Sequence, residues 1–78
     1  MKVIFNFPTD FAFSLDMSHV PRIGDKIWLS RIDEQDFSNT NDYNEFTKIR
    51  DERVEWQVKE VLWTPMSGGY TYVNLTLE

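Results

Sequence analysis

Few side chains in this 78-residue sequence could carry acid–base or nucleophilic chemistry: there is one histidine, His19, and no cysteine. Ser14, Ser18 and Ser30 lie near His19 in the chain, but none of them stands in the sharp turn pattern that exposes a catalytic serine. The 13 acidic residues offer pairs of carboxylates, yet glycoside hydrolysis needs a scaffold that surrounds a sugar, which so short a chain rarely provides. We therefore predict that the protein is not an enzyme.

Metal and cofactor chemistry lacks its usual ligands as well. A zinc site typically takes three or four Cys or His ligands, and this chain offers a single imidazole. Residues 33–36 and 39–42 supply carboxylate and amide oxygens, but without the spacing of a helix–loop–helix calcium loop. The Ser-Gly-Gly run at residues 67–69 has neither the lysine nor the following helix of a phosphate-binding loop. We predict no bound metal and no cofactor.

The net charge of −5 bears on the class of partner. Bulk binding of nucleic acid relies on Lys and Arg neutralising phosphates, and an anionic membrane surface attracts the same cations. No apolar run approaches the length of about 18 residues that a membrane-spanning helix needs, and the first ten residues lack the apolar centre of a secretory signal. The expectation is a cytoplasmic protein that does not bind membranes, with nucleic acid disfavoured as a partner.

One cluster of basic and aromatic residues nevertheless fits nucleic acid. Trp28 is flanked in the sequence by Arg22, Lys26 and Arg31. Small barrels bind single strands by stacking bases on exposed aromatic rings beside cations that follow the backbone. The competing interpretation is that Trp28 covers one end of the core while the charges are solvated. These four residues are the candidate site of the alternative function, single-stranded nucleic-acid binding.

The elements that must position such side chains are predicted to be strands. Apolar and polar residues alternate with a period of two, which predicts a strand with one buried side, in residues 2–7, 11–16, 26–31, 54–64 and 70–77. Pro8 stands in a turn between the first two runs, which predicts a hairpin; a single long strand with a bulge at Pro8 is the alternative, because proline cannot donate to a ladder.

The fourth run, residues 54–64, changes phase in the middle. Trp56 and Val58 alternate on even positions, whereas Val61 and Trp63 continue the apolar face from odd positions. A slip of one residue would turn every following side chain to the other face unless an extra residue absorbs it. We therefore predict a bulge or sharp bend near residues 59–60, with Val61 and Trp63 on the apolar side of the sheet.

Residues 33–53 form an acidic insertion without strand periodicity. Either a long hairpin arm or a short helix over residues 43–50 fits this segment, and Asn41 or Asp42 could cap such a helix. Its aromatic residues, Phe37, Tyr43 and Phe46, are candidate anchors for a protein partner, because apolar patches rimmed by charge mark interaction sites. The competing interpretation is that they fold back over one end of the sheet.

These elements predict a mainly β protein: one domain, residues 1–78, built as a small antiparallel five-stranded barrel or strongly bent sheet. The run Pro-Arg-Ile-Gly-Asp-Lys-Ile-Trp-Leu at residues 21–29 resembles the Gly-Asp turn that leads into a strand of Src-homology-3-like barrels. Residues 56–61 and 72–75 resemble the bent strand and its hairpin partner in that family. The resemblance implies a small barrel and assigns no ligand groove.

For function we expect a non-catalytic interaction module that binds another protein or itself. Lack of catalytic and cofactor motifs leaves partner binding as the remaining class, and 15% aromatic residues supply the side chains that interfaces favour. Nucleic-acid binding through Trp28 and its basic neighbours is the alternative.

Overall fold

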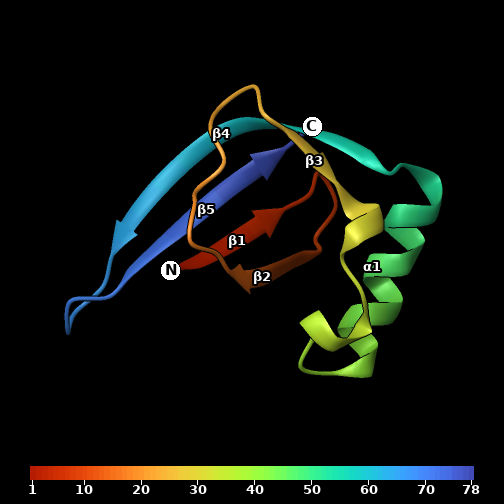
Figure 1. The fold of residues 1–78 in the computed structure, drawn as a ribbon, viewed down its shortest axis with the longest axis horizontal. Coiled ribbons are helices and arrows are strands. Elements are labelled where there is room, and N and C mark those ends of the chain that lie inside the picture. Colours follow the sequence, from red (N-terminus) through yellow and green to blue (C-terminus); the bar gives the residue numbers. More distant parts are fainter.

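A computed structural model describes all residues from Met1 to Glu78. The chain folds into five strands, one α-helix and two short 3₁₀ helices (Figure 1). Their bounds are β1 Lys2–Asn6, β2 Ala12–Asp16, β3 Lys26–Trp28, η1 Leu29–Arg31, η2 Glu34–Asp36, α1 Thr40–Glu52, β4 Glu55–Pro65 and β5 Thr71–Leu77. The mainly β fold class and the strongly bent sheet are confirmed.

The strands form one curled sheet in the order β2-β1-β5-β4-β3. Neighbouring strands are antiparallel except β1 and β5, which run parallel with Val3 opposite Val73. The sheet is thus mixed, whereas the sequence patterns predict an antiparallel one. Only a tight hairpin forces antiparallel pairing, and β1 and β5 are joined by a connection long enough for a parallel pair. Since β2 and β3 are edges, the sheet curls without closing.

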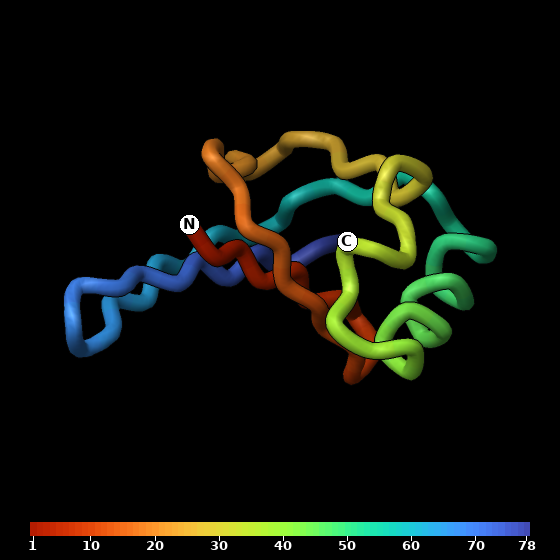
Figure 2. The backbone as a smooth tube through the Cα atoms, turned by 60° about the horizontal axis from the view of Figure 1, so that its bottom comes forward, coloured from red at the N-terminus to blue at the C-terminus, as the bar shows by residue number.

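The N-terminal hairpin forms, rather than one long bulged strand. β1 and β2 pair antiparallel with Phe5 opposite Phe13, and their rings stack with centroids 5.1 Å apart. The turn between them is closed by the Phe7 amide, which donates to the Phe11 carbonyl. Residues 17–25 then run from the β2 edge of the sheet to its opposite edge, where they lead into β3 (Figure 2).

The predicted irregularity in β4 is confirmed. The pairing of β4 with β5 shifts by one residue between Val58 and Glu60. Trp56 and Val58 precede the bulge, and Val61 follows it on the same concave face, opposite Leu75. The extra residue both preserves the apolar face and bends the strand, since bulges sharpen local twist.

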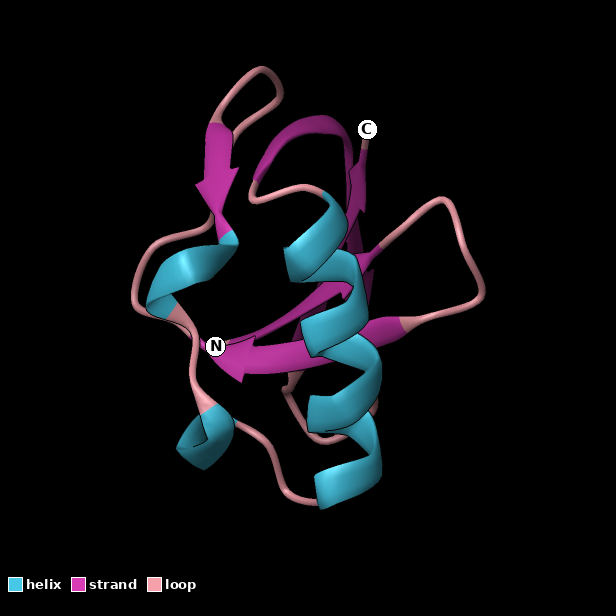
Figure 3. Ribbon diagram, turned by 90° about the vertical axis from the view of Figure 1, so that its right-hand side faces the viewer, coloured by secondary structure: helices cyan, strands magenta, loops and turns pink.

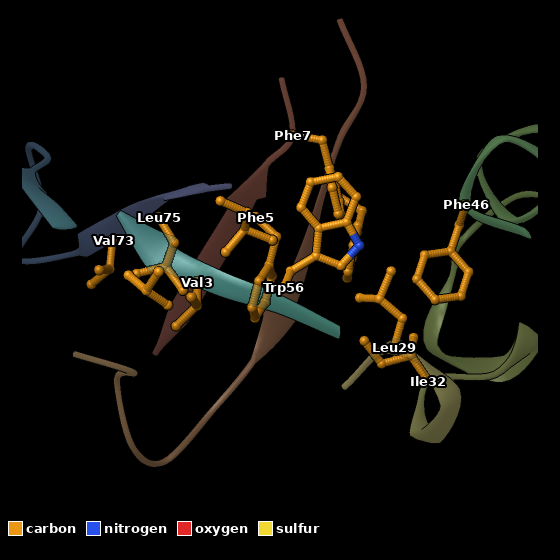
Figure 4. Packing of buried hydrophobic residues seen from close by; sticks show 12 residues of the cluster. Val3, Phe5, Phe7, Leu29, Ile32, Phe46, Trp56, Val73 and Leu75 are labelled. Carbon is orange, nitrogen blue, oxygen red and sulfur yellow. The ribbon is translucent and has the colours of Figure 1, made fainter. Parts of the chain in front are cut away.

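The core fills the concave side of this sheet toward α1. It contains 12 buried side chains, all apolar: Val3, Phe5, Phe7, Phe13, Leu29, Ile32, Phe46, Trp56, Val58, Val73, Leu75 and Leu77 (Figure 4). α1 and the two 3₁₀ helices lie together at one end of the sheet (Figure 3). No buried side-chain nitrogen or oxygen lacks a hydrogen-bond partner, so burial of polar groups costs this small fold little.

The acidic insertion contains the helix, and the hairpin-arm alternative is wrong for this segment. α1 begins at Thr40 and ends at Glu52, so it is longer than the predicted helix over residues 43–50. Asn39 is the N-cap, and its side-chain oxygen accepts a hydrogen bond of 2.8 Å from the Asp42 amide. The predicted caps, Asn41 and Asp42, instead lie in the first turn.

Candidate interaction surface

The end of the β4–β5 hairpin projects from the body of the protein on the side opposite α1 (Figures 1 and 2). We call residues 61–72 the arm: residues 65–71 extend beyond β1, whereas residues 61–64 lie opposite the part of β5, Tyr72 to Leu75, that pairs with β1 on its other side. Within it the two strands pair regularly from Val61 opposite Leu75 to Pro65 opposite Thr71. The Met66 amide donates to the Tyr70 carbonyl at 2.7 Å, and Gly68 and Gly69 have φ of +89° and +84°, which favours glycine in this turn. The arm is therefore a hydrogen-bonded hairpin rather than an irregular loop.

Large apolar side chains are exposed on the arm. Leu62 is 57% exposed, Trp63 52%, Met66 44% and Tyr70 70%. They account for four of the seven large exposed hydrophobic residues of the whole chain. Leu62 and Trp63 are consecutive in a strand and so point to opposite faces of it. Both faces of the arm therefore present apolar surface.

The arm also lies within a stretch that carries no charge. Residues 61–77 contain no Lys, Arg, Asp, Glu or His, although charged residues make up 27% of the chain. All eight basic and all 13 acidic side chains belong to residues 1–60 and Glu78. The arm thus contributes no charged side chain of its own, although the Lys2 ammonium of β1 lies 5.2 Å from the ring centroid of Tyr72.

One backbone edge of the arm has no strand beside it. β3 pairs with β4 only at residues 55–57, and the turn before β3 bonds to Val58, so β4 has no neighbour on that side from residue 61 onward. Met66 and Tyr70 form a hydrogen-bonded pair, so the next pair, Pro65 with Thr71, is a non-hydrogen-bonded one, which suits a residue without an amide hydrogen. Such pairs alternate along an antiparallel ladder, so the backbone groups of Val61 and Trp63 point to the open edge.

The aromatic residues predicted as partner anchors lie together, but inside the fold. Phe46 is fully buried, while Phe37 and Tyr43 are half-buried. Their ring centroids are 5.0 Å apart for Phe37 and Phe46 and 5.7 Å for Phe37 and Tyr43, and Phe13 lies 5.3 Å from Phe46. In this monomer Phe46 offers no surface to a partner. The group packs α1 onto the sheet, in agreement with the competing interpretation.

The predicted nucleic-acid residues are only partly brought together. Trp28 is 56% exposed, and Lys26 lies two residues earlier on the same face of β3. Lys26 forms an ion pair of 3.1 Å with Glu55. Arg22 lies in the turn before β3, where it lines a surface pocket with Lys26, and Arg31 ends η1. The site amounts to one exposed ring beside one cation that is already paired.

No family model, curated protein or solved structure matches this chain. The resemblance to Src-homology-3-like barrels stays a prediction. None of the helices has the length and apolar character needed to cross a bilayer. No three His, Cys, Asp or Glu side chains lie close enough together to hold a metal ion.

The sequence patterns do not single out the arm. They place Trp63 on the apolar side of the sheet, and it does lie on the concave face, opposite Val73. The core, however, does not extend to Trp63: Val73, directly opposite it on β5, is fully buried, whereas Trp63 is half exposed. The signal that could have found this surface is the absence of charge over 17 consecutive residues.

Proposed function

We propose that this protein is a non-catalytic interaction module that binds protein through the arm. The observation that carries the proposal is the group of four exposed side chains (Leu62, Trp63, Met66 and Tyr70) on a projecting hairpin without charge. Single exposed apolar residues are normal on protein surfaces, whereas contiguous apolar patches mark interaction sites. Trp, Tyr and Met are also among the residues enriched in interfaces.

The geometry favours docking for an energetic reason. Burying a large apolar side chain completely stabilises a complex by roughly 1.5–3 kcal/mol. Because these four side chains are about half exposed, each would contribute about 1 kcal/mol on docking. The hydrogen-bonded hairpin fixes their backbone before binding, so little backbone entropy is lost when a partner covers them.

A pair of tryptophan substitutions tests the proposal. Trp63 and Trp28 both lie on strands and are 52% and 56% exposed, so Trp63→Glu and Trp28→Glu make the same chemical change on the arm and off it. Each variant is checked for folding by circular dichroism and used as bait beside the wild type. A protein recovered by the wild type is then purified and its affinity for all three baits measured.

The proposal predicts that Trp63→Glu weakens the affinity at least tenfold while Trp28→Glu leaves it within a factor of two. Equal affinities of the purified partner for all three baits would contradict it, because the arm would then not be the contact.

Single-stranded nucleic acid on β3 is the second candidate, supported by the exposure of Trp28 beside Lys26. It requires that adding an oligonucleotide at low salt quench tryptophan fluorescence, that added salt reverse the effect and that Trp28→Glu remove it. An absence of quenching at low salt would end this candidate. The ion pair of Lys26 with Glu55 and the net charge of −5 both weigh against it.

A further inference from the structure

We infer that the partner of the arm is a second copy of this chain, joined by antiparallel pairing of the open edge of β4 with the same edge of its copy, centred on Leu62. This inference rests on the proposed function, because it names the occupant of the same surface. It makes the protein a symmetric dimer whose two arms overlap and whose two bodies lie at opposite ends.

Charge limits where two copies can meet. Two chains of net charge −5 repel one another through their bodies. The open edge of residues 61–64 carries no charged side chain and lies away from the helical end, so two copies can meet there without placing their acidic helical ends in contact. A strongly basic partner would find nothing on the arm that complements its charge.

The open edge also has defined limits. Lys59, Glu60 and the bulge precede it, and Pro65 ends it. Charged residues, bulges and prolines are the devices that prevent pairing at the edge of a sheet. Between these limits lie Val61, Leu62, Trp63 and Thr64, an uncharged and β-favouring segment on which no such device is placed.

The two-fold register follows from the backbone groups. With Leu62 opposite its own copy, Val61 lies opposite Trp63 of the second copy, and both residues point their amide and carbonyl groups to the edge. Each therefore finds a donor and an acceptor, which gives four hydrogen bonds across the axis. The same register sets Glu60 opposite Thr64, so no like charges meet.

The neighbouring registers are worse. Centring the pairing on Val61 places Glu60 opposite Leu62 and so brings a carboxylate against an apolar side chain. Centring it on Trp63 places Val61 opposite Pro65, which has no amide hydrogen to donate. Only the pairing centred on Leu62 satisfies the outward groups of both Val61 and Trp63.

Disulfide trapping tests the register, because the chain has no cysteine of its own. In the inferred register residue 62 faces its copy in a non-hydrogen-bonded pair, with Cα atoms about 4.5 Å apart, which a disulfide can span. Leu62→Cys should therefore give a covalent dimer under mild oxidation. Thr64→Cys, on the same face of the same strand, is the matched control and should give no covalent dimer, because residue 64 lies opposite Glu60.

Sedimentation equilibrium tests the association itself. The wild type and Trp28→Glu should rise toward twice the monomer mass with increasing concentration, whereas Trp63→Glu should keep the monomer mass. Added salt should leave the dimer unchanged or strengthen it, since it screens the repulsion between the bodies. Equal trapping of the two cysteine variants would overturn the register.

The outcomes separate this inference from the proposed function. A wild type that stays monomeric at all concentrations overturns self-pairing. If a different purified protein then binds in a manner lost in Trp63→Glu and kept in Trp28→Glu, the arm remains a binding site with another occupant. A dimer that survives Trp63→Glu and resists trapping at residue 62 overturns the inference, because the self-contact then lies elsewhere. The proposed function is then decided by the affinity of another purified protein for the Trp63→Glu and Trp28→Glu variants.

Discussion

The two ends of this small sheet both carry aromatic residues, and the same kind of side chain has opposite surroundings at each end. Trp56, in the body, is 9% exposed; its indole nitrogen donates to the Arg53 carbonyl at 2.9 Å, and the Arg53 guanidinium lies 4.0 Å from the ring centroid. Trp63, on the arm, is 52% exposed and has no such partner. Aromatic content alone therefore does not distinguish a core from an interface.

Charge distinguishes the two ends better. In the aromatic group of the body, Phe13 of the sheet packs against Phe37 and Phe46 of the insertion, which carries many of the acidic side chains. Those charges keep the covering segment solvated while its aromatic residues turn inward. The arm has no charged residue to keep it in water, and its apolar side chains have no segment to cover them. The difference suggests that the body is complete as a monomer and that the arm is not.

The largest expected effect that sharpens this comparison is on folding. Phe46→Ala removes a fully buried ring, and we expect it to lower the free energy of unfolding by roughly 3–5 kcal/mol, which could unfold so small a domain. Trp63→Ala removes a larger but half-exposed ring and should cost the monomer about 1 kcal/mol or less. Urea denaturation at low protein concentration measures both. Similar losses for the two variants would show that the arm belongs to the core.

A smaller effect is expected at the turn that shapes the arm. Gly69 has a φ of +84°, and no atom lies within 4 Å of the place that a β-carbon would occupy, so Gly69→Ala adds backbone strain without a steric clash. A left-handed conformation costs a non-glycine residue roughly 1–2 kcal/mol. Thermal melts should show this loss, and Ser67→Ala should not. An unchanged melt for Gly69→Ala would mean that the turn does not hold the arm in its shape.

The smallest effect concerns the helix that covers the body. Asn39→Ala removes the N-cap of α1 and should cost about 1 kcal/mol. Asn41→Ala, in the first turn of the same helix, is the control and should change stability by less than about 0.5 kcal/mol, as surface substitutions usually do. Neither substitution should alter self-association, because α1 lies at the end away from the arm. If Asn39→Ala loses the dimer and Asn41→Ala keeps it, self-association depends on α1, and the two ends of the sheet are not independent.

The period-two patterns predicted the strands and the bulge because each is a local property of the chain. They could not predict the parallel pairing of β1 with β5, which depends on how residues far apart in the sequence come together. The acidic insertion allowed a helix or a hairpin arm, and packing of Phe46 onto Phe13 accompanies the helix that formed. Period two tells which face a residue occupies and not where along the strand the core ends, as the buried Val58 and the half-exposed Trp63 show on one face of β4, and so it does not reveal the candidate site.

Amide hydrogen exchange along β4, followed at low and high protein concentration, tests the central claim most directly. The amides of Val61 and Trp63 point to the open edge, whereas those of Leu62 and Thr64 point to β5. The account predicts that Val61 and Trp63 exchange quickly in dilute protein and become protected as its concentration rises, while Leu62 and Thr64 are protected throughout. Exchange at Val61 and Trp63 that does not change with concentration would contradict a β4 edge that pairs with its own copy.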